Sequence, residues 1–403
     1  MISVEQAHRI LQDNIPQPKT VSVKLVEALG RYLSEDIRAP EPSPRYTNSA
    51  MDGFALRWQD YAVNRSDRGV RLKIIGESQA GIPFTGVVER GTAVRISTGA
   101  MLPEGSDTVV RVEDTQEEQG YVTVLEARAL GQDVRHAGEE FEQGELLFRK
   151  GDSLGARELA LLAAVGMQSI PVYSQPLVAL LITGTELAPY DAENIQSYQI
   201  RDSNSIMLMS AVRETGAKIE TVLHVQDSLE ETIQAVQNSM GSGANLIICS
   251  GGVSVGRHDH IKEAATAAGF RELFWKIQQK PGKPLLVSRR EDTLLFGLPG
   301  NPVSAYMCFA NYVRPVLANL LGTSSVNRLL TARTKIRLEN RGKRTNFVRV
   351  RVEDKPNEIA VIKEVAQQGS HMLSSIVKAD GYIVLQPGER LEPGSLVEVA
   401  LFL

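Results

Sequence analysis

The spacing of hydrophobic residues changes near Pro176, and this change divides the chain. Between about residues 46 and 136, short runs of alternating apolar and polar side chains are separated by glycine-containing turns, which is typical of β-strands with one buried face. From Leu177, continuous apolar runs alternate with helical patterns, which predicts a parallel sheet covered by helices on both faces. After about residue 321, short alternating runs return and predict a small β-barrel or sandwich.

Two glycine-containing loops each follow a buried strand in the α/β part of the chain. They are Ser250–Gly256 and Pro299–Pro302, and each is followed by a helical pattern. Backbone N–H groups at a helix start attract negative charge, and ligands of open α/β sheets bind at the carboxyl ends of the strands. The loops therefore predict a cradle for a phosphate or another oxyanion. Part of the pattern is architectural, because glycine suits tight turns and Asn-Pro is a natural helix start.

Three lysines lie between the two loops, at positions 276, 280 and 283. If this segment is extended, its period of two places Lys276 and Lys280 on one face, and the prolines around Lys283 stiffen the chain. Cations this close repel one another unless an anion balances them, so all three are candidates for binding the oxyanion. The alternative is a set of solvated surface lysines.

Several carboxylates are expected at the same edge of the sheet, namely Glu186, Asp202, Asp227 and Asp259. Carboxylate oxygen and water are the ligands that Mg²⁺ prefers. The alternatives are structural, since Asp227 begins a capping-box pattern and Asp259 stands where a helix cap would. His258 and His260 flank Asp259 and leave open a transition-metal site, although solvated loop histidines explain them more simply.

Composition narrows the class of protein. A chain of 403 residues implies two to four domains, and a net charge of −4 gives no support for nucleic-acid binding. Cys249 and Cys308 lie in apolar runs, as buried thiols do in a reducing compartment. The first residues lack a signal-peptide pattern, and no apolar stretch approaches the roughly twenty residues of a membrane span. We expect a cytoplasmic protein.

Five motifs, in order along nearly the whole chain, resemble the molybdopterin molybdenumtransferases, the family of the MoeA proteins and the gephyrin E domain. The first two lie in the β-rich region, where each alone is ambiguous. The motifs are Asn48–Ala55, Ser97–Ala100, Ser250–Gly256, Lys280–Pro284 and Leu298–Ser304.

The resemblance implies a multidomain α/β plus β subunit in four parts. Residues 1–43 and 137–170 would form an elongated region, whose first helix could pack on the α/β domain, and residues 44–136 an inserted β domain. Residues 171–321 would form a three-layer α/β catalytic domain with a mostly parallel sheet, and residues 322–403 a small C-terminal β-barrel.

The resemblance also implies a reaction. Molybdenum from molybdate would enter adenylylated molybdopterin, with release of AMP and with Mg²⁺ assisting. Such proteins form homodimers with the active site near the interface. Further partners would be the molybdopterin adenylyltransferase and molybdoenzyme acceptors, in transient contacts, with no nucleic acid and no membrane. A molybdopterin adenylyltransferase or a non-catalytic scaffold of the same fold are the alternative functions.

Site residues follow from the matching positions of this sequence. The catalytic candidates are Asp52, Asp259, Lys276 and Lys280. The metal candidates are Glu186, Asp227 and Asp259. The substrate-binding candidates are Thr98, Ser250, Gly251, Gly252, Ser254, Lys283, Pro299, Gly300, Asn301, Pro302, Arg349, Ser370 and Ser375. The chain departs from the family where Gly184-Thr-Glu-Leu187 replaces Gly-Asp-Glu-Leu, so Thr185 removes one carboxylate from the metal set.

Overall fold

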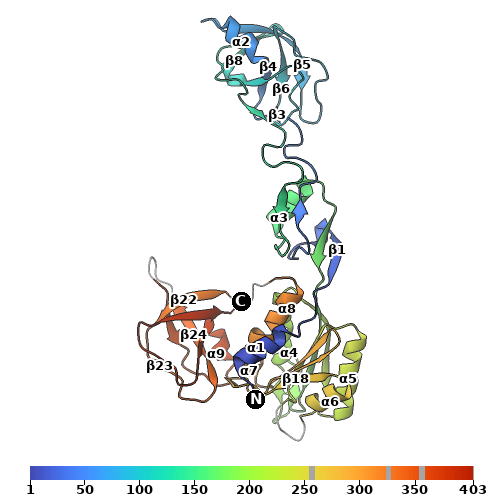
Figure 1. The fold of residues 1–403 in the computed structure, drawn as a ribbon, viewed down its shortest axis with the longest axis vertical. Coiled ribbons are helices and arrows are strands. Elements are labelled where there is room, and N and C mark those ends of the chain that lie inside the picture. Colours follow the sequence, from blue (N-terminus) through green and yellow to red (C-terminus); the bar gives the residue numbers. More distant parts are fainter. Residues whose placement is uncertain (254–258, 324–327, 354–358, 403) are drawn as a thin grey trace. The chain divides into compact units, whose positions relative to one another are not determined.

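The computed structural model describes residues 1–253, 259–323, 328–353 and 359–402. The chain packs as two compact units (Figure 1). The first contains residues 1–34, 151–155 and 169–403, and the second contains residues 35–150 and 156–168. Each unit is described by itself. None of the helices within these ranges is long and apolar enough to cross a membrane.

A six-stranded sheet forms the centre of the first unit. In spatial order its strands are β16 (Lys218–Val225), β13 (Leu177–Thr183), β17 (Leu246–Ser250), β21 (Thr293–Leu298), β20 (Leu286–Arg290) and β18 (Arg271–Trp275). The first four are parallel to one another, whereas β20 runs antiparallel to both β21 and β18. Five of the six strands thus share one direction, and the expectation of a mostly parallel sheet is confirmed.

Side chains of successive residues in the central strands enter two different cores, because a strand alternates its faces. Leu180 of β13 packs with α1 (Val4–Gln12), α4 (Asn204–Glu214), α7 (Pro302–Cys308) and α8 (Arg314–Leu320). Its neighbour Leu181 packs on the other side with α5 (Leu229–Gly241) and α6 (Ile261–Ala267), which lie together in Figure 1. The three-layer arrangement is therefore confirmed.

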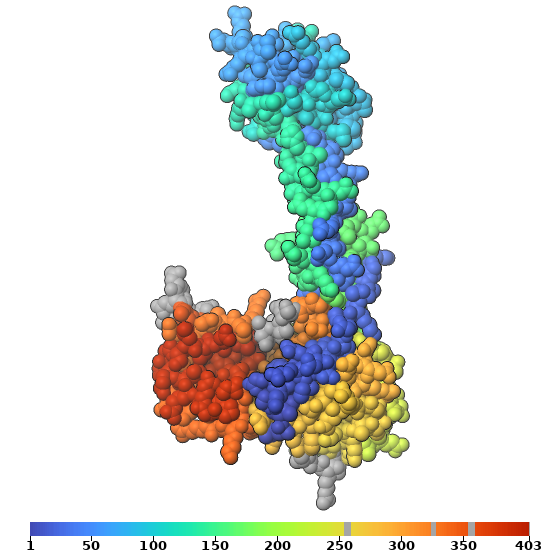
Figure 2. Space-filling view, viewed as in Figure 1, coloured from blue at the N-terminus to red at the C-terminus, as the bar shows by residue number. Residues whose placement is uncertain are grey.

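Helix α1 has Ser3 as its N-cap, in a capping box with Gln6. Its apolar residues pack against the sheet, and Glu5 lies 3.4 Å from the Gln386 side chain of the C-terminal domain. Figure 2 shows this N-terminal segment, in dark blue, lying against both domains. Farther along, β1 (Thr20–Lys24) pairs antiparallel with β12 (Ser169–Tyr173).

A closed five-stranded barrel follows the α/β domain, as the alternating pattern predicted. Its strands close in the order β24, β25, β22, β28 and β26. Their bounds are β22 (Leu329–Thr334), β24 (Thr345–Glu353), β25 (Val361–Glu364), β26 (Gly381–Leu385) and β28 (Leu396–Leu401). Val350, Ile362 and Val399 fill its interior. The short β19 (Gln279–Lys280) pairs in parallel with the first two residues of β24, Thr345 and Asn346. This pairing links the barrel to the segment that carries the lysines.

The second unit contains the β-rich region. Its main sheet has the spatial order β7-β4-β6-β5-β9-β8 and is mixed. These strands are β4 (Gly53–Leu56), β5 (Val70–Ser78), β6 (Thr92–Ile96), β7 (Thr108–Arg111), β8 (Thr115–Glu118) and β9 (Tyr121–Val124). Phe54, Leu72 and Val110 lie in its core. The unit also contains α2 (Trp58–Asn64) and α3 (Ala156–Ala164), and Gly166, just after α3, has φ +77°. The finer division of the chain into four parts stays a prediction.

Candidate active site

A pocket of about 580 Å³ opens where β13, β17 and β21 end, at the carboxyl edge of the sheet. Both predicted glycine-containing loops contribute to its wall. Residues from the sheet edge and loops are Thr183, Gly184, Glu186, Asp227, Ser250, Gly251, Gly252, Val253, Asp259, Pro299, Gly300, Asn301 and Pro302. The remainder are Leu187, Ile200, Arg201, Asp202, Ser203, Asn204, Pro284 and His371.

The first loop requires glycine where it leaves β17. Gly251 and Gly252 have φ angles of +93° and +64°, which residues with a Cβ rarely adopt. A Cβ at Gly251 would lie 2.5 Å from the carbonyl oxygen of Thr183, at the end of the neighbouring strand. The loop therefore passes directly over the sheet edge, and its backbone forms the pocket wall.

The second loop sits beside the first. Gly251 donates its N–H to the carbonyl oxygen of Leu298 at 3.1 Å. As the sequence predicted, Asn301 is the N-cap of α7 and Pro302 occupies its first turn. A Cβ at Gly300 would meet only the Cα of Gly251, at 3.7 Å. The two loops thus approach each other at their glycines.

Three residues that line this pocket have backbone N–H groups without a partner among the described residues. Among the described residues, the N–H groups of Gly252, Gly300 and Asn301 donate no hydrogen bond. Gly300 and Asn301 are exposed, and Gly252 is partly exposed, so a ligand can approach these donors. Unpartnered amides at a loop that precedes a helix are suited to oxyanions.

Asn204 joins the two loops, and the sequence reasoning missed it. Its Nδ2 donates to Ser250 Oγ at 2.8 Å and to the carbonyl oxygen of Gly300 at 2.7 Å. Asn204 is the first residue of α4 and is buried. The two partners are 46 and 96 residues away in the chain, so no local pattern could have identified this contact.

Four carboxylates line the pocket: Glu186, Asp202, Asp227 and Asp259. The expectation that Asp227 caps the next helix is wrong, because Ser228 is the N-cap of α5 and accepts the N–H of Glu231 at 3.4 Å. Asp227 instead accepts the backbone N–H of Thr185 at 3.1 Å. This contact uses the backbone of Thr185, so it does not depend on the side chain by which this chain departs from the family.

Among the residues that the structure describes, no three His, Cys, Asp or Glu side chains form a group that could hold a metal ion. His260, which was weighed as a zinc ligand, is the N-cap residue of α6. His258 and the substrate candidate Ser254 lie outside the described residues.

None of the three predicted lysines is in the pocket wall. The expectation that Lys276 and Lys280 share one face of an extended segment is wrong, because Lys276 has φ +65° directly after strand β18, while Lys280 lies in the separate β19. The ammonium of Lys276 lies 3.8 Å from the ring centroid of Trp275. The indole of Trp275 donates to the carbonyl oxygen of Val253, so Lys276 stays close to the first loop, whereas Lys280 and Lys283 are exposed.

The candidates in the C-terminal domain differ in their surroundings. Ser370 lies beside the second loop, where its Oγ is 3.4 Å from Asn301 Nδ2, and the neighbouring His371 lines the pocket. Ser375 is buried and donates to the carbonyl oxygen of Met372 at 2.6 Å. Arg349 is fully buried in β24, outside the pocket wall, and burial lowers the pKa of its guanidinium.

The structure brings together the two candidates of the second unit. Asp52 Oδ1 accepts the backbone N–H of Thr98 at 2.6 Å and its hydroxyl at 3.0 Å. These hydrogen bonds hold the pKa of the exposed Asp52 carboxyl below its usual value. The first two motifs of the sequence therefore meet in space within this unit.

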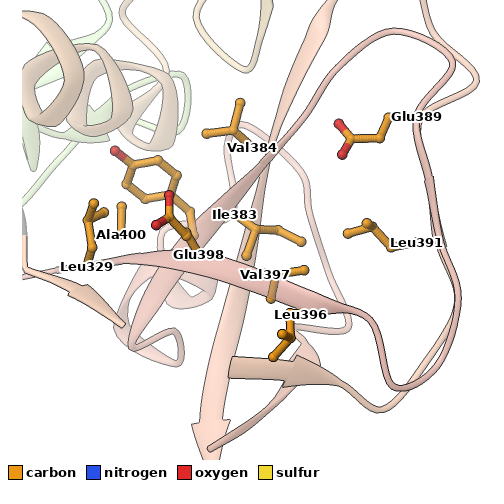
Figure 3. Close-up of a pocket in the computed structure, with 10 residues that line it drawn as sticks. Leu329, Ile383, Val384, Glu389, Leu391, Leu396, Val397, Glu398 and Ala400 are labelled. Atoms are coloured by element: carbon orange, nitrogen blue, oxygen red, sulfur yellow. The ribbon is translucent and has the colours of Figure 1, made fainter. Parts of the chain in front are cut away.

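A second concavity, of about 440 Å³, lies on the C-terminal barrel (Figure 3). Its wall is formed mainly by aliphatic side chains such as Leu329, Val384 and Leu396, together with the carboxylates of Glu389 and Glu398. No cation lines it. An oxyanion would be repelled there, so the pocket at the sheet edge is the better candidate.

Three family models match consecutive parts of the chain. They are the MoeA N-terminal region (domains I and II) at residues 2–166, a probable molybdopterin binding domain at residues 179–319, and the MoeA C-terminal region (domain IV) at residues 331–402. The second match contains both loops of the pocket.

Similar proteins match over most of their length. A molybdopterin molybdenumtransferase from Haemophilus influenzae is 34% identical over 390 residues, which cover 96% of this chain and 95% of the relative. One from Synechococcus elongatus is 37% identical over 73% of this chain and 74% of its own length. The crystal structure of a molybdopterin biosynthesis MoeA protein from Pyrococcus horikosii superposes with a TM-score of 0.87 at 30% identity, covering 100% and 99% of the two chains. The chain belongs to the MoeA family of molybdopterin molybdenumtransferases.

Proposed function

We propose that this protein transfers molybdenum from molybdate to adenylylated molybdopterin and releases AMP. In this reaction the two dithiolene sulfurs of the pterin bind the metal, and one molybdate oxygen leaves as water with the two thiol protons, so molybdenum keeps its oxidation state. Water cleaves the phosphoanhydride, so that AMP leaves and the pterin keeps its own phosphate. Membership of the family supports the reaction, and the observation that carries it is the pair of loops with open amides at the sheet edge.

The open amides suit the phosphoanhydride of this substrate. The N–H groups of Gly252, Gly300 and Asn301 would donate to its phosphate oxygens. Donors held by the backbone need no rearrangement as charge develops on the leaving phosphate. Such preorganisation is commonly the largest single contribution to lowering the activation free energy. Ser250, Gly251, Pro299 and Pro302 would shape this wall, and Asn204 would hold its two halves together.

The carboxylates would act on water. Glu186, Asp227 and Asp259 line the same pocket, and each could accept a proton from the water that attacks the phosphoanhydride. Glu186 and Asp227 also suit Mg²⁺ that arrives with the phosphates, because this ion is commonly held by one or two carboxylates, water and substrate oxygens. When bound, Mg²⁺ would neutralise phosphate charge.

The remaining candidates would complete the site. Lys276, Lys280 and Lys283 would attract the dianionic molybdate and the phosphates by long-range charge. Asp52 and Thr98, in the second unit, stay candidates for catalysis and for substrate binding, respectively. Ser370 would contact substrate beside the second loop, and Arg349 and Ser375 would act from within the C-terminal domain. We also propose a cytoplasmic homodimer, with transient contacts to a molybdopterin adenylyltransferase and to molybdoenzyme acceptors.

The test of this function is AMP release by the purified full-length chain. Incubation with adenylylated molybdopterin, molybdate and Mg²⁺ should release one AMP per molybdenum incorporated, and omission of molybdate should suppress the release. A matched reaction with non-adenylylated molybdopterin and ATP distinguishes the adenylyltransferase. Consumption of ATP there, without molybdate-dependent AMP release in the first reaction, would contradict the proposal, and inactivity in both would favour a scaffold.

A further inference from the structure

Two buried oxygen atoms at the pocket have no hydrogen-bond donor. They are Oδ2 of Asp202 and Oδ1 of Asn204, and neither has a partner among the described residues. The two residues are 1% and 7% exposed, and both line the pocket. Buried acceptors are almost always paired in native proteins, so an unpaired one requires an explanation.

Both side chains are held in fixed orientations by their other atoms. Asp202 Oδ1 accepts the backbone N–H of Ser205 at 3.0 Å, which ties the carboxylate to the start of α4. Asn204 uses its Nδ2 for the two loops and therefore cannot rotate its amide without breaking both contacts. The two unpaired oxygens, on residues two positions apart, are thus held in place at the start of α4.

The imidazole of His224 does not satisfy Asp202. His224 Nε2 lies 3.9 Å from Oδ2, which is beyond hydrogen-bond length, and its side chain is 56% exposed. A metal ion does not explain the oxygens either, because the described residues offer no group of three ligands. A bound donor then explains the oxygens, either an ordered water or a ligand group that donates hydrogen bonds.

The proposed substrates narrow the choice of donor. Molybdate and the phosphoanhydride present only acceptor oxygens, which a carboxylate would repel. The pyrimidine ring of a pterin presents an amino group beside a ring N–H, two donors on one edge. A carboxylate and an amide oxygen are complementary to such an edge. The ribose hydroxyls of the adenylyl group are the other donors.

We propose that Asp202 and Asn204 recognise the donor edge of the pterin ring and so determine the specificity of this pocket for pterins. The inference rests on the proposed function, since it places the pterin of that substrate at the start of α4. The oxyanion end would then reach the amides of Gly252 and Gly300, which belong to the same pocket. The pocket would thus offer hydrogen-bond acceptors to the pterin end of the substrate and hydrogen-bond donors to its phosphate end.

The test compares two ligands that differ at the recognised edge. Pterin-6-carboxylate carries the 2-amino group, whereas the matching lumazine has a carbonyl oxygen in its place. The unaltered full-length protein should bind the pterin at least about 10-fold more tightly, because a missing donor leaves the acceptors unpaired. In Asp202→Asn, the amide oxygen Oδ1 can still accept the N–H of Ser205 at the start of α4. The amide nitrogen Nδ2, a donor, replaces the unpaired acceptor Oδ2. This variant should bring the affinity ratio close to one.

The control is Asp60→Asn, because Asp60 is also a buried carboxylate that accepts a backbone N–H, that of Gly91, but lies in the second unit. It should keep the ratio of the unaltered protein. A ratio that persists in Asp202→Asn, or no binding of the pterin to the unaltered protein, would overturn the inference. So would a loss of AMP affinity in Asp202→Asn with an unchanged pterin ratio, which would assign the oxygens to ribose. These are binding measurements, so their outcome is separate from the failure of molybdate-dependent AMP release.

Discussion

Replacement of Gly251 by alanine tests how the first loop is built. A Cβ at this position would lie 2.5 Å from the carbonyl oxygen of Thr183 and 2.8 Å from its hydroxyl. The backbone φ of +93° is also unfavourable for alanine. Gly251→Ala should therefore displace the loop from the sheet edge and separate it from Leu298, whose carbonyl oxygen accepts its N–H.

The structure offers a matched control for the size of this effect. Gly243 follows α5, has φ +83°, and has no atom within 4 Å of its virtual Cβ. Gly243→Ala should lower the free energy of unfolding by about 1–2 kcal/mol, from backbone strain alone. Gly251→Ala carries the same strain plus overpacking of roughly 1–3 kcal/mol, so its total loss should be about 2–5 kcal/mol.

Fluorescence can report this change at the loop itself. The chain has two tryptophans, and the indole of Trp275 donates to the carbonyl oxygen of Val253 at 3.1 Å. In a Trp58→Phe background, Trp275 is the remaining tryptophan and reports on the α/β domain during urea unfolding. Its native emission should shift in Gly251→Ala and not in Gly243→Ala.

Equal losses of stability in the two variants would refute the reasoning, because the contact with Thr183 would then contribute nothing. A third variant separates folding from ligand access. A Cβ at Gly300 meets only Gly251 Cα, at the ordinary contact distance of 3.7 Å. Gly300→Ala should therefore keep the unfolding free energy within about 0.5 kcal/mol while it impedes ligand access to the open amides.

Three further predictions address charge and pH. Lys276→Ala should lower kcat/KM for AMP release by about 10-fold, because it removes a long-range attraction on the anions. Lys262→Ala removes the other ammonium beside the same indole ring, but that ammonium is already paired with Glu272 at 2.8 Å, so the variant should stay within about threefold. Equal effects would contradict a role of Lys276 in attracting the anions. Thr98→Val should raise the pKa of Asp52 toward 3.8 in ¹³C NMR titrations without restoring it fully, because the backbone N–H still donates. Burial lowers the pKa of His8 below 6.5, so the unfolded chain binds a proton at this side chain more readily than the folded chain does. The free energy of unfolding should therefore fall as the pH falls from 6.5 through the pKa of His8 in the folded protein. His8→Phe should remove this part of the pH dependence, measured as the melting temperature against pH.

The parts of the site that depend on local sequence were predictable. A continuous apolar run identifies a buried strand such as β13, and the Asn-Pro pair identifies the start of α7. Both loops therefore fell at the carboxyl edge of the sheet, as predicted. Local periodicity was sufficient because strand and helix patterns are set by neighbouring residues.

The predictions that proved wrong concern features that depend on contacts between distant segments or on the conformation of a single residue. Asp227 has the sequence of a helix cap, yet its carboxylate accepts the backbone N–H of Thr185, which follows β13, and Ser228 caps the helix. The shared face expected for Lys276 and Lys280 required an extended chain, and the positive φ of Lys276 breaks it. Neither the Thr185 contact nor this backbone conformation leaves a signature in a single sequence.

Anomalous scattering from molybdenum tests the central claim most directly. Crystals of the full-length protein soaked with adenylylated molybdopterin and molybdate should show the molybdenum signal in the pocket walled by Gly252, Gly300 and Asn301. The electron-density map of the same crystals should place the pterin ring at Asp202 and Asn204. A molybdenum signal against the apolar concavity of the C-terminal barrel, with the sheet-edge pocket free of substrate, would contradict the account.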